Sequence, residues 1–169
     1  MDELLRLLDD ARADERSDSR ERERRLRQAA EEGATLAGTL VDLAEHGTGV
    51  TVRTASGRSH HGPVRLVGSD FCVVGEVWVA LRAITTVRPD PAQRSEPAAG
   101  DRPTTDLLLF EALSRIAPER PRVALVTRNG EVVAGELRSV GADVVTLRLD
   151  GDQGACYVSA SAIGEVLPG

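Results

Sequence analysis

The spacing of hydrophobic residues changes along this chain, and the changes mark its organisation. From Asp2 to about Glu32 the sequence contains neither Gly nor Pro, and leucines at its start and alanines near its end flank a charged middle. Acidic residues precede basic ones by four positions here, as in Glu21 and Arg25, a spacing that stabilises a solvated helix. We therefore expect a long charged N-terminal helix over residues 1–33.

Two later segments share one pattern of apolar and turn residues. Apolar positions at three-to-four spacing predict a short helix over residues 35–46 and another over residues 105–117. Short β-branched runs divided by Gly-containing turns follow each helix and predict five strands per segment. Adding 73 to a position in the first segment gives its counterpart in the second, and after six extra residues the offset becomes 79. Matched positions are Gly57 and Gly130, Gly62 and Gly135, Gly68 and Gly141, and Trp78 and Tyr157. The chain therefore contains an internal repeat.

Proline, glycine and small polar residues dominate the stretch between the two segments, which is typical of a linker. We expect a first unit over residues 34–89, a linker over residues 90–104 and a second unit over residues 105–169. Units of this size gain stability by packing against one another or against another chain.

Each unit runs from a helix through a Gly turn, a strand with an internal glycine and a Val-Gly-x-Asp turn to a closing strand. This order resembles the Sm-like family of SH3-type β-barrels over residues 35–89 and 105–168. The resemblance implies a mainly β, α+β fold of two tandem five-stranded Sm-like barrels, each preceded by a short helix. Members of the family pair their edge strands into rings, and they bind RNA or scaffold other proteins.

Both units depart from the RNA-binding members of that family. Asp70 begins Asp-Phe-Cys-Val and Asp143 begins Asp-Val-Val-Thr, with no Asn where those members carry one. Thr85-Thr86 and Gly164-Glu165 replace the usual Arg-Gly of the closing turn. We therefore transfer no RNA-binding residues, and we interpret Asp70 and Asp143 as turn residues whose side chains bond nearby amides.

Composition narrows the range of functions that we expect. A net charge of -6 and an aromatic share of 2% both disfavour general binding of nucleic acid. We expect a non-enzymatic binding or scaffold protein that holds a protein partner, or self-associates, through barrel edges and its helical arm. The alternative is a nucleic-acid-associated regulatory protein. Contact residues for either partner are Arg20, Arg24, Arg27, Arg53, Arg58 and Arg128.

One histidine pair is the remote alternative, a metal protein or an enzyme centred on His60 and His61. No third ligand is evident in the sequence, and the matched positions in the second unit are Val133 and Ala134. We therefore expect His60 and His61 to lie in an exposed turn. The chain contains no G-x-x-x-x-G-K-[ST], H-E-x-x-H or G-x-S-x-G motif, so we expect no enzyme, no cofactor and no small-molecule substrate.

The remaining signals concern the cell compartment. Cys72 and Cys156 lie far apart without a C-x-x-C pair, which indicates reduced, buried cysteines. The acidic N-terminus has no continuous apolar run, so we expect neither a secretory signal nor a membrane span, and a cytoplasmic location. All 21 cationic residues are Arg, which is typical of a GC-rich bacterial genome.

Overall fold

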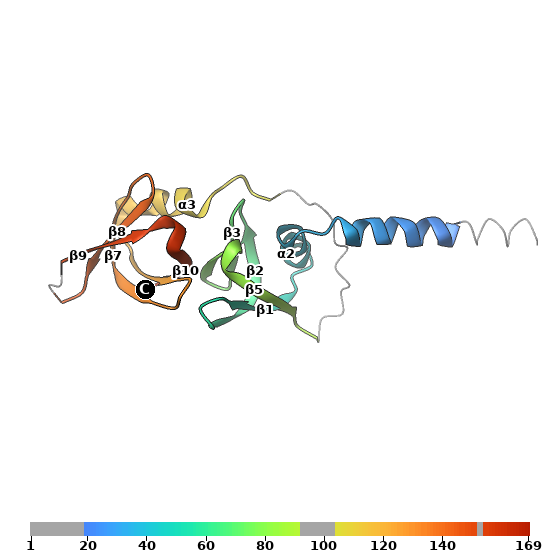
Figure 1. The fold of residues 1–169 in the computed structure, drawn as a ribbon, viewed down its shortest axis with the longest axis horizontal. Helices are drawn as coiled ribbons and strands as arrows, with labels where there is room; N and C mark the ends of the chain where they lie inside the picture. The colour runs from blue at the N-terminus through green and yellow to red at the C-terminus, as the bar shows by residue number, and fades with distance from the viewer. Residues whose placement is uncertain (1–18, 92–103, 152–153) are drawn as a thin grey trace, which may run out of the picture.

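The computed structural model describes residues 19–91, 104–151 and 154–169 of the chain (Figure 1). We call residues 34–91 the first half of the body and residues 104–169 the second half. The first half contains α2 (Leu36–Glu45), β1 (Gly49–Thr54), β2 (Ser59–Val67), β3 (Phe71–Val74), β4 (Val77–Ala80), the 3-10 turn η1 (Leu81–Ala83) and β5 (Ile84–Pro89). The second half contains α3 (Leu109–Ile116), η2 (Ala117–Glu119), β6 (Arg122–Thr127), β7 (Val132–Val140), β8 (Val144–Leu149), β9 (Ala155–Ser159), η3 (Ala160–Ala162) and β10 (Ile163–Pro168).

All ten strands belong to one open antiparallel sheet, which corrects the predicted fold class. The strand order is β5-β1-β2-β3-β4-β10-β6-β7-β8-β9. Two closed five-stranded barrels would pair β4 with β5 and β9 with β10, whereas β4 pairs with β10 across the two halves. The prediction of two barrels was wrong because alternating side chains identify a strand without specifying which strand lies at each of its edges.

Strand register corresponds pair by pair between the halves. Arg53 lies opposite Thr86 in the first half, and Val126 lies opposite Glu165 in the second. The first pair becomes the second by adding 73 to one position and 79 to the other. Both ladders also shift register at their η-turn end, where Thr54 meets Ile84 and Thr127 meets Ile163. The halves therefore share backbone geometry even where their side chains differ.

The N-terminal helix covers residues 19–32 and ends at Gly33, whose N–H donates to the Ala29 carbonyl. We call residues 19–32 the arm helix. The described residues contain no long N-terminal helix, which corrects the prediction for residues 1–33; residues 1–18 lie outside the description. A short helix without tertiary contacts is marginal in water, so helix propensity alone is a weak basis for a long one. None of the helices described is long and apolar enough to cross a membrane.

Two hydrophobic clusters pack against the sheet. Buried residues of the first cluster come from the first half and are Leu40, Leu43, Val50, Val52, Val64, Val67, Cys72, Val74 and Val79. The second cluster is built around α3, β6, β7 and β8, and it also includes Phe71, Ala80 and Ala83 of the first half. The second half therefore completes its core with side chains of the first, which couples the stability of the two halves.

Candidate functional site at the junction of the two halves

Strands β4 and β10 form the junction between the two halves. Trp78 lies opposite Val166 and Val79 lies opposite Glu165 in this short antiparallel ladder. On its other side β10 pairs with β6, so Glu165 lies in the interior of the ten-stranded sheet. A charged residue in such a place needs specific partners, because burial of an unpaired charge is strongly unfavourable.

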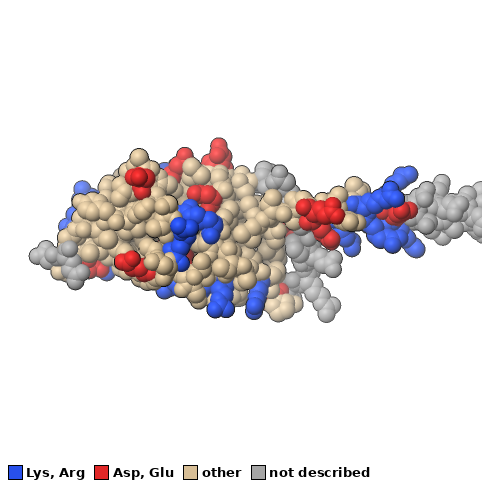
Figure 2. Space-filling view, in the orientation of Figure 1, with Lys and Arg blue, Asp and Glu red and all other residues tan. Residues whose placement is uncertain are grey.

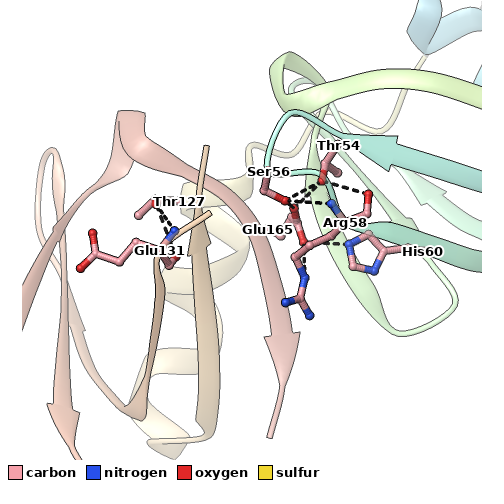
Figure 3. Close-up of polar contacts among 7 residues, drawn as sticks. All are labelled: Thr54, Ser56, Arg58, His60, Thr127, Glu131 and Glu165. Atoms are coloured by element: carbon pink, nitrogen blue, oxygen red, sulfur yellow. Dashed lines mark hydrogen bonds and ion pairs between the residues drawn. The ribbon is translucent and has the colours of Figure 1, made fainter. Parts of the chain in front are cut away.

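Those partners all come from the hairpin formed by β1 and β2. Glu165 is 1% exposed, and its Oε1 accepts hydrogen bonds from Thr54 Oγ1 and Ser56 Oγ, each at 2.6 Å (Figure 3). Its Oε2 accepts a hydrogen bond from His60 Nε2 at 2.7 Å and lies 3.3 Å from Arg58 Nε. We call these five residues the Glu165 cluster. It binds one carboxylate of the second half to one hairpin of the first.

The Glu165 cluster favours the ionised carboxylate. Burial by itself would raise the pKa of Glu165, because it removes water from the charged form. The hydrogen bonds from Ser56, Thr54 and His60, with the charge of His60, outweigh burial and lower the pKa below its ordinary value. The carboxylate is therefore charged and fully engaged at neutral pH.

Serine, histidine and glutamate also occur in hydrolase triads, in which histidine takes the serine proton and the carboxylate orients histidine. The order of contacts is different here. Ser56 and His60 donate to different oxygens of the same carboxylate, so the carboxylate stands between them. This geometry joins two segments of chain, and it lacks the serine-to-histidine contact that activates a nucleophile.

Arg82 crosses the junction in the opposite direction. It lies in η1, and its Nη2 donates to the carbonyls of Ala160 and Ile163 at 2.9 Å and of Ser161 at 3.3 Å. These carbonyls belong to η3 and the start of β10, so one guanidinium covers the turn that leads into the junction strand. Hydrogen bonds from a charged donor are stronger than those between neutral groups.

Asp70 forms a third connection between the halves, which corrects its interpretation as a turn residue. Its Oδ1 accepts a hydrogen bond from the Leu109 N–H at 2.7 Å, at the first turn of α3. Helix α3 lacks a Ser, Thr, Asp or Asn at its N-cap, which is Leu108, and Glu111 accepts the Leu108 N–H instead. A carboxylate from the first half therefore caps a helix of the second. Asp143, the matched residue, is exposed.

The segment before α3 also binds the first half. Thr105 N–H donates to the Val67 carbonyl, and Ser69 N–H donates to the Leu107 carbonyl, both at 2.9 Å. A Cβ at Gly68 would lie 2.6 Å from the Leu107 carbonyl oxygen, so this close approach requires glycine. The helix predicted over residues 105–117 begins later, at Leu109, because the preceding residues pair with this turn.

His60 and His61 do not form a joint site. They are consecutive residues of β2, so their side chains point to opposite faces, and only His60 is buried. His60 binds Glu165, while His61 Nδ1 lies 3.1 Å from Thr51 Oγ1. The expected exposed turn is wrong for His60. Among the residues with described positions, no group of three His, Cys, Asp or Glu side chains could hold a metal ion.

The two cysteines are free and differ in environment. Cys72 is buried in the first hydrophobic cluster, and burial raises the pKa of its thiol to about 12. Cys156, on β9, is only half-buried, in contrast to the buried position expected. Cys72 therefore remains a neutral thiol with poor reactivity.

The six candidate arginines do not form one surface. Arg20, Arg24 and Arg27 lie on the arm helix, and Arg58 belongs to the Glu165 cluster. Arg53 is exposed on β1, and Arg128 is exposed in the turn between β6 and β7.

Glu165 and Arg82 were missed as important residues by reasoning from the sequence. The available signal was a charged residue within the otherwise apolar closing run Ile-Gly-Glu-Val-Leu of residues 163–167. Its counterpart in the first half is Thr86, which is exposed. A charge between apolar residues, at a position where the matched strand has an uncharged residue, indicates a buried partner, although it does not identify that partner.

Comparisons with known proteins identify no family for this chain. No protein-family model matches this chain, and neither a curated protein nor a solved structure matches it. Kinship with the Sm-like family therefore stays a prediction. The division into units over residues 34–89 and 105–169 also stays a prediction.

Proposed function

We propose that this chain is a non-enzymatic binding protein. Its ten-stranded sheet serves as a scaffold, and the arm helix binds a protein partner. The observation behind the proposal is the exposure of the arm helix, which leads away from the body in Figure 1. Thirteen of its fourteen residues are exposed and Ala30 is half-buried; Leu26 is 72% exposed. A helix of this length is marginal alone, so a partner that buries it would also stabilise it.

The charges of the arm helix favour an acidic protein surface as the partner. Arg20, Arg24 and Arg27 follow one another at spacings of four and three, which places them on one face of the helix. Arg25 lies on another face and pairs with Glu21 at 2.7 Å. Figure 2 shows positive and negative side chains interleaved along this helix. The basic face is therefore narrow, and we call these three arginines the arm stripe.

Nucleic acid is the second candidate partner for the arm stripe. Three arginines on one helix face can contact consecutive phosphates, and such contacts weaken steeply as salt rises. The overall charge of -6 opposes an acidic protein surface and a phosphate backbone alike, so it does not separate the two candidates. A protein partner also uses Leu26, which lies away from the arm stripe and adds apolar contact area to an interface but nothing to a phosphate contact.

Site-specific photo-crosslinking tests the proposal. A photoreactive amino acid replaces Gln28 in the full chain within native cells, and we expect one discrete protein adduct. An Arg20→Gln, Arg24→Gln, Arg27→Gln variant should reduce the yield about tenfold or more, and Leu26→Gln should also reduce it. Arg115→Gln, on the exposed surface of α3, is the control for loss of one positive charge and should leave the yield unchanged.

Two other crosslinking results would contradict the proposal. Adducts with nucleic acid that depend on the arm stripe but not on Leu26 would replace the protein partner with a phosphate backbone. A yield that none of the arm variants changes would overturn the role of the arm helix.

Self-association through sheet edges is the other predicted partnership, and the side chains at those edges offer little support. The free edges of the described sheet are β5 and β9. Suppose that β5 of one copy paired with β9 of another copy, in the way that β10 pairs with β4 within the chain. Thr86 would then occupy the position that Glu165 has at the junction. The matching hairpin would present Thr127, Asn129 and Glu131 instead of the donors of the Glu165 cluster. Light scattering at high micromolar concentration tests this reasoning, which predicts a monomer.

A further inference from the structure

A cleft of about 530 Å³ lies in the second half, and none of its lining residues belongs to the Glu165 cluster or to the arm helix. It is lined by residues of β6, β7 and β8 and of the turn between β8 and β9. Three of the residues in its lining are arginines, Arg120, Arg122 and Arg148, and two are acids, Glu136 and Asp150. A cleft of this volume lies within the range that holds small molecules.

Positive charge exceeds negative charge around this cleft. Arg122, Glu136 and Arg148 form a row across three neighbouring strands, in which Glu136 lies opposite both arginines. Glu136 Oε2 lies 3.5 Å from Arg148 Nη2, and its Oε1 lies 3.3 Å from Arg138 Nη1, while Asp150 forms a two-point ion pair with Arg122. The lining itself therefore holds three arginines and two carboxylates, a local excess of one positive charge, and Arg138 binds Glu136 from outside the lining.

Arg120 has an unusual backbone conformation for its residue type. Its φ is 50°, and no other non-glycine residue of the described chain has a positive φ. The matched position in the first half is Gly47, with a φ of 64°. Glycine adopts this conformation without strain and arginine does not. The exposed Arg120 therefore occupies a position where the matched turn uses glycine.

The other charged residues of the cleft are equally specific to the second half. The positions matched to Arg122, Glu136 and Arg148 are Gly49, Pro63 and Gly75. The loop with six extra residues begins next to Arg148 and supplies Asp150. Shared backbone geometry therefore does not require these charges. Cross-strand ion pairing alone would account for Arg122, Glu136 and Arg148, but it gives no role to Arg120.

We propose that this cleft binds a small molecule carrying a phosphate monoester, with Arg120 as its principal contact. A phosphate monoester carries close to two negative charges at neutral pH and three strong acceptor oxygens, which suits a cleft where three arginines outnumber two carboxylates. Arginine also presents paired N–H donors that suit phosphate oxygens. This inference is independent of the arm helix and adds a ligand that the sequence did not predict.

Titration with phenyl phosphate and benzoate tests the proposal. Both probes carry the same ring, and only one carries a phosphate. We expect phenyl phosphate to bind saturably with a Kd of about 1 mM, the affinity of two or three charge-assisted hydrogen bonds. NMR shifts of the arginine Nε–Hε groups should locate it at Arg120, Arg122 and Arg148. Benzoate at equal ionic strength should bind at least about tenfold more weakly.

Arg120→Gly is the decisive variant because it restores the residue that the first half uses at this turn. Its thermal unfolding midpoint should equal or exceed that of the parent protein, while phenyl phosphate binding falls about tenfold. Arg115→Gln removes a positive charge elsewhere in the second half and should change binding less than twofold. The proposal fails if phenyl phosphate does not saturate, if benzoate binds equally well, or if Arg120→Gly binds like the parent.

Discussion

The same turn has different roles in the two halves of this protein. In the first half, the hydroxyl groups of Thr54 and Ser56 donate to a carboxylate of the second half. In the second half, Thr127 Oγ1 donates to Asn129 Oδ1 at 2.6 Å, within its own turn. It also accepts from the Glu131 N–H at 3.1 Å (Figure 3). Thr54 Oγ1 also lies 2.8 Å from Ser56 Oγ, so the two turns share their local contacts and differ in the bonds to the other half. The junction depends on side chains that occur in one half only.

This difference explains why the junction forms once. Among the polar contacts between the halves are those of three side chains, Glu165, Arg82 and Asp70. The matched residues are Thr86, Ser161 and Asp143. A sheet that extended through β5 and β9 in the same manner would lack the connections of Glu165 and Arg82, because Thr86 and Ser161 cannot supply a carboxylate or a guanidinium. The side chains therefore favour pairing within the chain over pairing between copies.

The largest expected effect comes from Glu165→Ala. The substitution removes the buried acceptor shared by His60, Arg58 and two hydroxyl groups, so we expect a loss of about 3–5 kcal/mol in the free energy of unfolding. Urea denaturation followed by circular dichroism measures it. Thr86→Ala at the matched exposed position should cost less than about 0.5 kcal/mol. Equal losses in the two variants would contradict the asymmetry.

Arg82→Ala should have the next largest effect. It removes a charged donor from three carbonyl groups of η3 and β10, and we expect a loss of about 2 kcal/mol in the free energy of unfolding. Hydrogen exchange should show faster exchange in β10 in particular. Arg88→Ala, on the edge strand β5, is the control. If β10 exchanges at the parental rate in the Arg82 variant, this guanidinium does not secure the junction.

The third prediction compares substitutions at two matched acidic residues, Asp70→Ala and Asp143→Ala. Loss of the cap at Leu109 should cost about 1 kcal/mol, the usual effect of removing an N-cap carboxylate. Asp143→Ala should be nearly neutral, because its side chain is exposed. Chemical denaturation of both variants gives the comparison. A greater loss in the Asp143 variant would reverse our assignment of the capping residue.

The smallest effect concerns pH. Because the pKa of Glu165 is lowered in the folded protein, its charge stabilises folding above the ordinary carboxyl pKa. That contribution should disappear as the pH falls through the lowered pKa. The stability advantage of the parent protein over Glu165→Gln should therefore shrink as the pH falls through the lowered pKa of Glu165. A difference that grows on acidification would show that the pKa is raised.

Much of the local structure could be predicted from the sequence. The helix predicted over residues 35–46 corresponds to α2 at Leu36–Glu45, because Thr35 caps a clear apolar stripe. The Asn-Gly and Ser-Gly turns lie between paired strands at the expected places. These features depend on residues close together in the chain, where spacing and turn chemistry are informative.

The candidate site was poorly predicted because its contacts span long distances along the chain. His60 was considered with its neighbour His61, whereas its partner is Glu165. Asp70 was assigned to its own turn, whereas it caps α3. No local pattern specifies such pairs, since any of several buried donors could satisfy a given carboxylate.

The sequence by itself determined the strands, the turns and the matched offsets of 73 and 79, because these follow from periodicity and from glycine. Only the tertiary structure decided that β4 pairs with β10, that Glu165 is buried against the first hairpin, and that the sheet is open. The physical reason is that a strand has two edges with equivalent hydrogen-bonding groups. Which edge is filled depends on side chains brought together from distant parts of the chain.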